Sequence, residues 1–219
     1  MQDTEIALSD MFSEAAWNER YQSRPSLWSG KPNPNLVSET HGLTAGTALD
    51  AGAGEGADAI WLAEHSWRVT ALDVSTVALQ RAAAHAAERG PEIADRVEWR
   101  QADLRSWDPG TERFDLVAAH YLQLPAALRA DVFGRLAAAV APGGTLLIVG
   151  HHPSDLQTTV PRPPMPELFY SGDDIAALLD VYEWKTVTND APGRAVTDPD
   201  GNPVTIHDTV FRATRRQSD

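Results

Sequence analysis

The sequence predicts an α/β fold whose doubly wound, mostly parallel sheet has seven strands and ends in an antiparallel hairpin. Short apolar segments alternate with helical patterns between residues 47 and 149, which is typical of βαβ units and a parallel sheet. Beyond residue 180, two candidate strands follow each other without a helix between them. Strands joined in this way pair antiparallel, so the hairpin is expected at the end of the sheet.

The predicted elements follow in chain order. A helical segment at 13–21 precedes a loop at 24–35 that is rich in Pro, Gly and Asn. The five parallel strands are expected at 47–50, 68–73, 96–101, 114–119 and 145–149. The helices between them are expected around 60–62, from the N-cap Ser75 to the stop at Gly90, and at 128–140. A short helix at 173–180 and hairpin strands at 185–189 and 204–214 complete the chain.

Composition limits the class of protein. The chain has 219 residues, which suits one domain, and no cysteine, which excludes disulfides, thiolate metal sites and cysteine nucleophiles. The net charge of −13 predicts repulsion of phosphate polymers, so no nucleic acid is expected as a partner. The first ten residues do not resemble a signal peptide, and no apolar run approaches the length of a membrane span. We therefore expect a cytoplasmic protein without a membrane partner.

The most informative segment is a glycine-rich turn between the first strand and the first helix of the sheet. It reads Asp50-Ala-Gly52-Ala-Gly54-Glu-Gly56. Glycines let the backbone turn sharply and let a ligand approach, while the helix start offers free N–H groups. Asp73, at the end of the second strand, could accept hydrogen bonds from both ribose hydroxyls. Because Gly52, Gly54 and Ala57 also fit the dinucleotide pattern, the turn alone leaves the kind of nucleotide open.

Three further features favour a cationic amino-acid nucleoside over a dinucleotide. A carboxylate two residues before the first glycine, Asp50, would repel a pyrophosphate but suits an ammonium group. Asp103 and Leu104 follow the third strand, where an acid can accept from an adenine amino group. The segment 136–144, followed by the terminal hairpin, is not how a dinucleotide fold usually closes.

Together these motifs resemble the class I S-adenosylmethionine-dependent methyltransferases. The matching segments are 49–56, 69–75, 101–104, 114–117 and 136–149, with Pro142-Gly-Gly144 before the fifth strand. The resemblance implies S-adenosylmethionine as cofactor. It implies that the donor is bound by Asp50, Gly52, Gly54, Asp73, Val74, Asp103, Leu104 and His120, the last of these through its backbone.

The segment before the sheet carries a second, shorter resemblance. Residues 17–21 and 27–30 are similar to bacterial small-molecule methyltransferases of the tellurite-resistance and thiol or thiopurine type. That similarity implies that Tyr21 and Trp28 close over the donor, although ordinary packing is the alternative. The single domain would then comprise an N-terminal helical lid at 1–40, a donor-binding core at 41–150, and an acceptor-side loop and hairpin at 151–219.

Residues that contact a methyl acceptor are expected at the carboxyl ends of the strands, where open α/β sheets bind ligands. Tyr121 follows the fourth strand, and His151 and His152 follow the fifth. These three are the candidate catalytic residues, and Tyr170 is expected to complete the pocket. Two adjacent histidines without further ligands do not predict a metal site.

The expected activity is transfer of a methyl group to a small thiol, phenol or nitrogen heterocycle. Such a displacement needs alignment and exclusion of water, and a base only where the acceptor is protonated. Two alternatives remain at this point. One is a nicotinamide-dependent oxidoreductase, and the other is a sensor that binds the donor without catalysis.

Overall fold

The computed structural model describes residues 10–163 and 165–217 and comprises two compact units, residues 1–108 and 109–219. Eight strands lie in the described residues, where seven were predicted. The predicted α/β class, with parallel strands followed by an antiparallel hairpin, is confirmed. The assignment of the whole chain to one domain with divisions at 40 and 150 stays a prediction.

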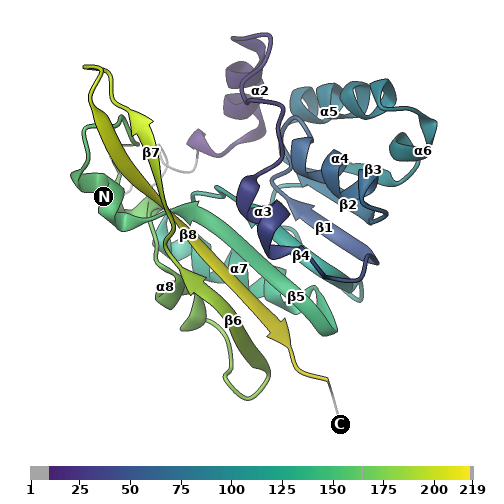
Figure 1. Ribbon diagram of the computed structural model, residues 1–219. Helices are drawn as coiled ribbons and strands as arrows, with labels where there is room; N and C mark the ends of the chain where they lie inside the picture. Colours follow the sequence, from purple (N-terminus) through teal and green to yellow (C-terminus); the bar gives the residue numbers. More distant parts are fainter. Residues whose placement is uncertain (1–9, 164, 218–219) are drawn as a thin grey trace. The chain divides into compact units, whose positions relative to one another are not determined.

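The first unit is built on three parallel strands, drawn in blue in Figure 1. They are β1 (Thr47–Ala51), β2 (Arg68–Asp73) and β3 (Val97–Gln101). The helices after them are α4 (Ala57–Glu64), α5 (Thr76–Glu88) and α6 (Pro91–Ala94). Because β2 pairs with both β1 and β3, Leu72 and its apolar neighbours are buried, and the ends of β1 and β2 are held side by side.

Helices α2 and α3 precede the strands of this unit. Helix α2 (Glu14–Gln22) begins where the side chain of Ser13 accepts from the backbone N–H of Ala16 at 3.2 Å. Helix α3 (Pro34–Glu39) begins at the cap Asn33 with proline at its first position, a favoured start. The predicted helical segment at 13–21 is thus confirmed.

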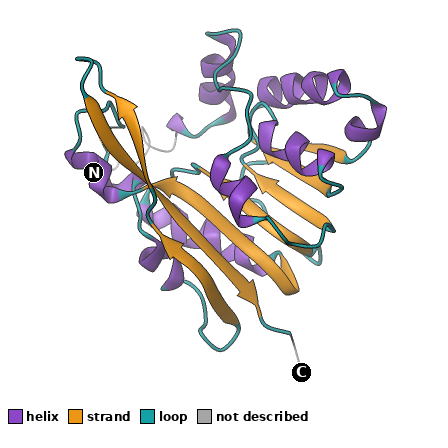
Figure 2. Ribbon diagram, viewed as in Figure 1, coloured by secondary structure: helices purple, strands orange, loops and turns teal. Residues whose placement is uncertain are grey.

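The second unit is a mixed sheet, and Figure 2 shows its long strands in orange. In order, its elements are β4 (Phe114–His120), α7 (Ala126–Ala138), β5 (Val140–His151), the 3₁₀ turns η1 (Pro153–Gln157) and η2 (Pro166–Leu168), α8 (Gly172–Ala176), β6 (Trp184–Asp190), β7 (Gly193–Thr197) and β8 (Pro203–Arg215). Strand β5 pairs parallel with β4 and antiparallel with β8, which in turn pairs antiparallel with β6 and β7.

Strand β7 is the element that the sequence prediction missed. Its five residues, Gly193–Thr197, are almost entirely exposed, so they carry no alternation of apolar and polar residues that would mark a strand. The strand exists because the turn at 198–202 folds the chain back: the N–H of Asp198 donates to the carbonyl of Asn202 at 2.9 Å. The segment between the two predicted hairpin strands therefore contains both the additional strand β7 and a tight turn at 198–202.

Among the residues that the structure describes, no helix is both long enough and apolar enough to cross a bilayer.

Candidate active site

The glycine turn leaves the end of β1 and leads into α4. Gly52, Gly54 and Gly56 all have left-handed backbones, with φ of 81°, 54° and 85°. The N–H groups of Gly52 and Ala53 donate to the carbonyl of Leu72 at 2.8 and 2.9 Å, which ties the turn to β2. Positive φ is costly for residues with a Cβ, so this loop shape requires glycine at these positions.

Asp73 ends β2 directly beside this turn. Its carboxylate accepts from the N–H of Gly54 and from the N–H of Ser75, each at 2.8 Å. Burial raises the pKa of Asp73 above its usual value, although these hydrogen bonds oppose the shift. An ionised carboxylate has about four lone-pair positions, and the N–H groups of Gly54, Ser75 and Val74 act on three of them, so at least one remains to accept from a ribose hydroxyl. Asp73 therefore fits the ribose of a nucleoside.

The turn after β3 is organised differently from the sequence prediction. The carboxylate of Asp103 is held by the guanidinium of Arg105 through contacts of 2.6 to 3.0 Å, and also accepts from the backbone N–H of Arg105. These charge-assisted hydrogen bonds lower the pKa of Asp103. Arg105 thus occupies the lone pairs that an adenine amino group would need. Reading of adenine by Asp103 requires the Arg105 side chain to move.

The other residues expected to bind the donor lie at the predicted strand ends or turns. Leu104 is buried, and the carbonyl of Val74 accepts from the side chain of Gln101 at 3.3 Å. Asp50 lies within β1 and is 2 % exposed, whereas His120 ends β4 in the second unit and is half-buried. Their roles toward a donor stay predictions.

Tyr21 and Trp28 lie over the glycine turn. The indole N–H of Trp28 donates to the hydroxyl of Tyr21 at 3.1 Å. A Cβ on Gly54 would lie 3.0 Å from that hydroxyl and 3.3 Å from the indole nitrogen, so the missing side chain is what allows this approach. Burial raises the pKa of Tyr21 above its usual range, and the charge of Asp73 adds to the shift. The aromatic pair therefore packs against the glycine turn, and its closing over a donor stays a prediction.

Glu55, the residue between the last two glycines, anchors the segment that carries Trp28. One carboxylate oxygen accepts from the N–H groups of Leu27 and Trp28 at 3.0 and 3.1 Å, and the other pairs with Arg81 at 2.8 Å. Arg81 also donates to the carbonyl of Tyr21 at 2.9 Å. Sequence reasoning missed Glu55 and Arg81. A non-glycine residue inside a glycine motif gives no sign of a partner far along the chain.

We predict that Glu55→Gln releases this segment. Burial alone would raise the pKa of Glu55, but hydrogen bonds from Arg81, Trp28 and Leu27 outweigh it, and the pKa lies below its usual value. A carboxyl whose pKa is lower in the folded protein than in the unfolded chain stabilises the fold at pH values above the unfolded-state pKa. This contribution is lost as the pH falls through the pKa of the folded protein. The anchor is therefore intact at pH 7 and is lost only in acid, as the pH falls through the lowered pKa of Glu55.

Hydrogen exchange of the amides of residues 26–28 measures the effect. The variant is expected to exchange these amides about tenfold faster or more at pH 7, because a charged hydrogen bond contributes roughly 1.5–3 kcal/mol. Glu64→Gln is the matched control, since Glu64 lies in α4 and makes only a 3.8 Å pair with Arg89. Equal exchange in both variants would show that Glu55 does not hold the segment.

In the second unit, Tyr121 and His151 form an aromatic pair at the carboxyl ends of β4 and β5. Their ring centroids are 4.8 Å apart, and Phe169 lies 6.1 Å from the His151 ring. Tyr121 has a left-handed backbone, with φ of 53°, and its N–H donates to the carbonyl of Val149 at 2.7 Å. Strained residues of this kind are found most often at functional sites.

His152 differs from its neighbour. Its ring nitrogen Nδ1 lies 2.9 Å from the hydroxyl of Ser154 and accepts from the N–H of Ser154 at 3.3 Å, so this side chain caps η1. Tyr170 also departs from expectation, because it is fully buried against Phe133 and beneath the guanidinium of Arg129. As a core residue, Tyr170 cannot line an acceptor pocket in this conformation, and that expectation was wrong.

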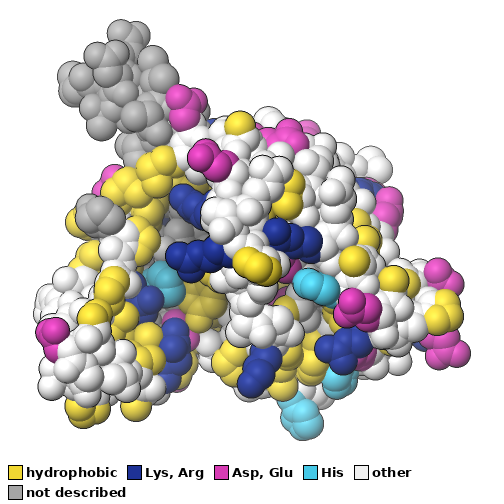
Figure 3. Space-filling model, turned by 90° about the horizontal axis from the view of Figure 1, so that it is seen from above, with side chains coloured by type: hydrophobic (Ala, Val, Ile, Leu, Met, Phe, Trp, Pro, Cys, Tyr) yellow, Lys and Arg dark blue, Asp and Glu magenta, His cyan; other side chains and the backbone are white. Residues whose placement is uncertain are grey.

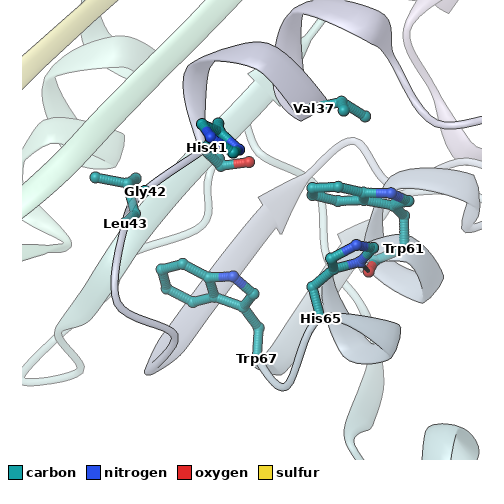
Figure 4. Close-up of a pocket in the computed structure, with 8 residues that line it drawn as sticks. Val37, His41, Gly42, Leu43, Trp61, His65 and Trp67 are labelled. Atoms are coloured by element: carbon teal, nitrogen blue, oxygen red, sulfur yellow. Dashed lines mark hydrogen bonds between the residues drawn. The ribbon is translucent and has the colours of Figure 1, made fainter.

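The first unit contains a cavity of about 310 Å³ that was not foreseen, and Figure 4 shows the residues that line it. Trp67 and the stacked rings of Trp61 and His65, 4.0 Å apart, line it together with the loop before β1. Trp67 precedes β2, so the cavity lies at the amino ends of the parallel strands. The glycine turn lies at the opposite, carboxyl end of β1, and this cavity is therefore separate from the donor loop.

The surface charge is mixed. Figure 3 shows acidic, basic and hydrophobic side chains interspersed on one face, with Lys and Arg in several separate groups. The net charge of −13 is thus not offset by a continuous basic stripe on that face.

The glycine turn, the acid ending β2 and the aromatic cover define a nucleoside-binding α/β fold. Comparison with known proteins specifies the class. Residues 48–144 match a family model described as a methyltransferase domain. The 2-heptyl-1-hydroxyquinolin-4(1H)-one methyltransferase of Mycobacteroides abscessus is 28 % identical over 201 residues, which span 89 % of this chain and 84 % of that protein.

Two solved structures have a fold similar to that of this chain. One, reported under "Conversion of a Disulfide Bond into a Thioacetal Group during Echinomycin Biosynthesis", has a TM-score of 0.71 and 25 % identity, and covers 94 % of this chain and 93 % of its own. The magnesium protoporphyrin IX methyltransferase of Synechocystis with bound SAH has a TM-score of 0.67 and 16 % identity, with 97 % and 99 % covered. These comparisons support a class I S-adenosylmethionine-dependent methyltransferase, and the nicotinamide alternative is set aside.

Proposed function

We propose that this methyltransferase transfers the methyl group of S-adenosylmethionine to a small, flat acceptor such as a phenol, a thiol or a nitrogen heterocycle. The observation that carries the acceptor class is the pair of Tyr121 and His151 at the ends of β4 and β5, with the ring of Phe169, which follows η2, beside His151. Aromatic rings with one or two polar atoms suit flat, partly apolar ligands. The hydroxyquinolone relative and the thioacetal-forming neighbour support the same class.

In this proposal Asp73 binds the ribose, the glycine turn receives the methionine part, and Tyr21 with Trp28 excludes water. S-adenosylmethionine, when bound, supplies an activated methyl group and so the reactivity of the step. His151 contacts the acceptor, while His152, which caps η1, holds the loop. Nitrogen heterocycles stay within the proposed range.

A phosphate polymer is not part of the proposal, because the net charge of −13 disfavours it. We also propose the cytoplasm as the location, which fractionation of cells with an antibody against the chain would test.

A panel of acceptors tests the function. We predict release of S-adenosylhomocysteine with a 1-hydroxyquinolone, a phenol or an aromatic thiol, and background rates with DNA, RNA or lipid vesicles. Calorimetry with S-adenosylhomocysteine runs beside the panel. Tight binding with no turnover on any small acceptor would favour the sensor alternative, and turnover confined to nucleic acid would reject the proposal.

A further inference from the structure

A buried carboxylate on β8 lies directly opposite His151. In the antiparallel pair of β5 and β8, His151 and Asp208 are register partners. Residues opposite each other in such a pair have their Cβ atoms about 4.5–5.5 Å apart on the same face of the sheet. The two side chains accordingly meet, with Nδ1 of His151 4.0 Å from Oδ1 of Asp208.

Asp208 is held in place from its other side. The second carboxylate oxygen, Oδ2, accepts from Nε of Arg194 at 3.2 Å. Asp208 also raises the pKa of Tyr121, which burial already raises, through its charge and a side-chain hydrogen bond. Asp208 is 3 % exposed, and Oδ1 has no hydrogen-bond partner among the described residues. A fixed, buried carboxylate thus presents a free lone pair toward the imidazole.

His151 is suited to be neutral at working pH. Burial and, secondarily, the charge of Arg162 lower its pKa to about 4. The charged and titratable groups that act on it from the packed elements are Arg162, Asp208, Asp155, Arg194 and Tyr121. Nδ1 is buried without a hydrogen-bond partner in the described chain, while 18 % of the side chain is exposed. The exposed part therefore belongs to the rest of the side chain, which includes Nε2.

We propose that Asp208 is a positioning residue that fixes the ring of His151, so that Nε2 takes the proton of a hydroxyl acceptor during methyl transfer. A carboxylate beside Nδ1 favours the tautomer with its proton on Nδ1, which leaves the lone pair on Nε2. The 4.0 Å separation is longer than a hydrogen bond, and catalytic hydrogen bonds commonly shorten when substrate binds. This inference rests on the proposed function.

During the transfer, the acceptor oxygen forms a bond to the methyl carbon. The bond between that carbon and the donor sulfur breaks, and its electron pair stays on the sulfur, which becomes a neutral thioether. The acceptor proton passes to Nε2, and Asp208 stabilises the resulting imidazolium. An acceptor that is already ionised needs no such transfer. The His151–Asp208 pair is therefore needed for hydroxyl acceptors that are protonated at working pH.

Nitrogen-15 NMR of the wild-type protein tests the tautomer without any substitution. A protonated Nδ1 and an unprotonated Nε2 at pH 7 are expected, and the opposite tautomer would overturn the proposal. The isosteric Asp208→Asn variant tests the rate with two phenols, one protonated and one ionised at the assay pH. Asp198→Asn, which alters a buried carboxylate in the β7–β8 turn, is the matched control.

With the protonated phenol, Asp208→Asn is expected to lose about tenfold or more of kcat at neutral pH, a fraction of the 10²–10⁴ that general bases contribute. The loss should shrink as the pH rises and the phenol ionises unaided, while the KM for the donor and the rate with the ionised phenol stay near wild type. Equal loss with both phenols would assign Asp208 a structural role and overturn the inference. If wild type turns over neither phenol but methylates a thiol of the acceptor panel, the inference fails while the proposed function stands.

Discussion

Replacing Asp73 with alanine is expected to weaken S-adenosylmethionine binding by tenfold or more in calorimetry. The substitution removes the acceptor for up to two ribose hydroxyls, and each hydrogen bond to a charged group contributes about 1.5–3 kcal/mol. It also frees the N–H of Gly54, which Asp73 holds at 2.8 Å, so the glycine turn loses one of its fixed points. Each 1.4 kcal/mol changes affinity about tenfold, so even one lost hydrogen bond is measurable.

Two further variants separate these effects. Asp73→Asn keeps one carbonyl oxygen that can accept from a backbone N–H. This variant should therefore keep most of the stability of the glycine turn but lose a larger share of the affinity for the donor. Asp95→Ala is the control, because Asp95 is an exposed residue that caps α6 in the same unit. If a folded Asp73→Ala protein bound the donor as tightly as wild type, Asp73 would be a structural residue of the turn only.

The proposed donor-binding residues are largely readable from the sequence because they are local. A strand, a glycine turn, a helix and the acid at the end of the next strand lie within a short stretch of chain, and their order alone defines the motif. Even so, Arg105 beside Asp103 was not foreseen. The carboxylate and the guanidinium are two residues apart, and a sequence pattern does not tell which partner a carboxylate will take.

The acceptor half depends on strand register, which the sequence does not give. His151 and Asp208 face each other only because β5 and β8 pair with one particular alignment, and a slip of one residue would turn the two side chains to opposite faces. The sequence therefore pointed to two adjacent histidines without distinguishing them. The structure separates them: His151 faces a buried carboxylate, and His152 caps a turn.

Gly56→Ala is expected to cause a large loss of stability in the first unit. Its φ of 85° is unfavourable for any residue with a Cβ. The new Cβ would in addition lie 2.6 Å from the ring of Trp99 and 2.8 Å from the Cβ of Ala82, so the start of α4 must shift away from α5 and β3. Overpacking of this kind typically costs about 1–3 kcal/mol beyond the backbone strain.

Gly42→Ala separates the two costs, because Gly42 has nearly the same φ, 84°, and a Cβ there would meet nothing within 4 Å. Urea unfolding followed by circular dichroism should show a loss of about 1–2 kcal/mol for Gly42→Ala, the backbone term alone. Gly56→Ala should lose about 1–3 kcal/mol more, as its contact with Trp99 and Ala82 requires. Equal losses in the two variants would mean that the glycine turn is selected for backbone conformation only, and that the packing of Trp99 against the start of α4 tolerates a side chain.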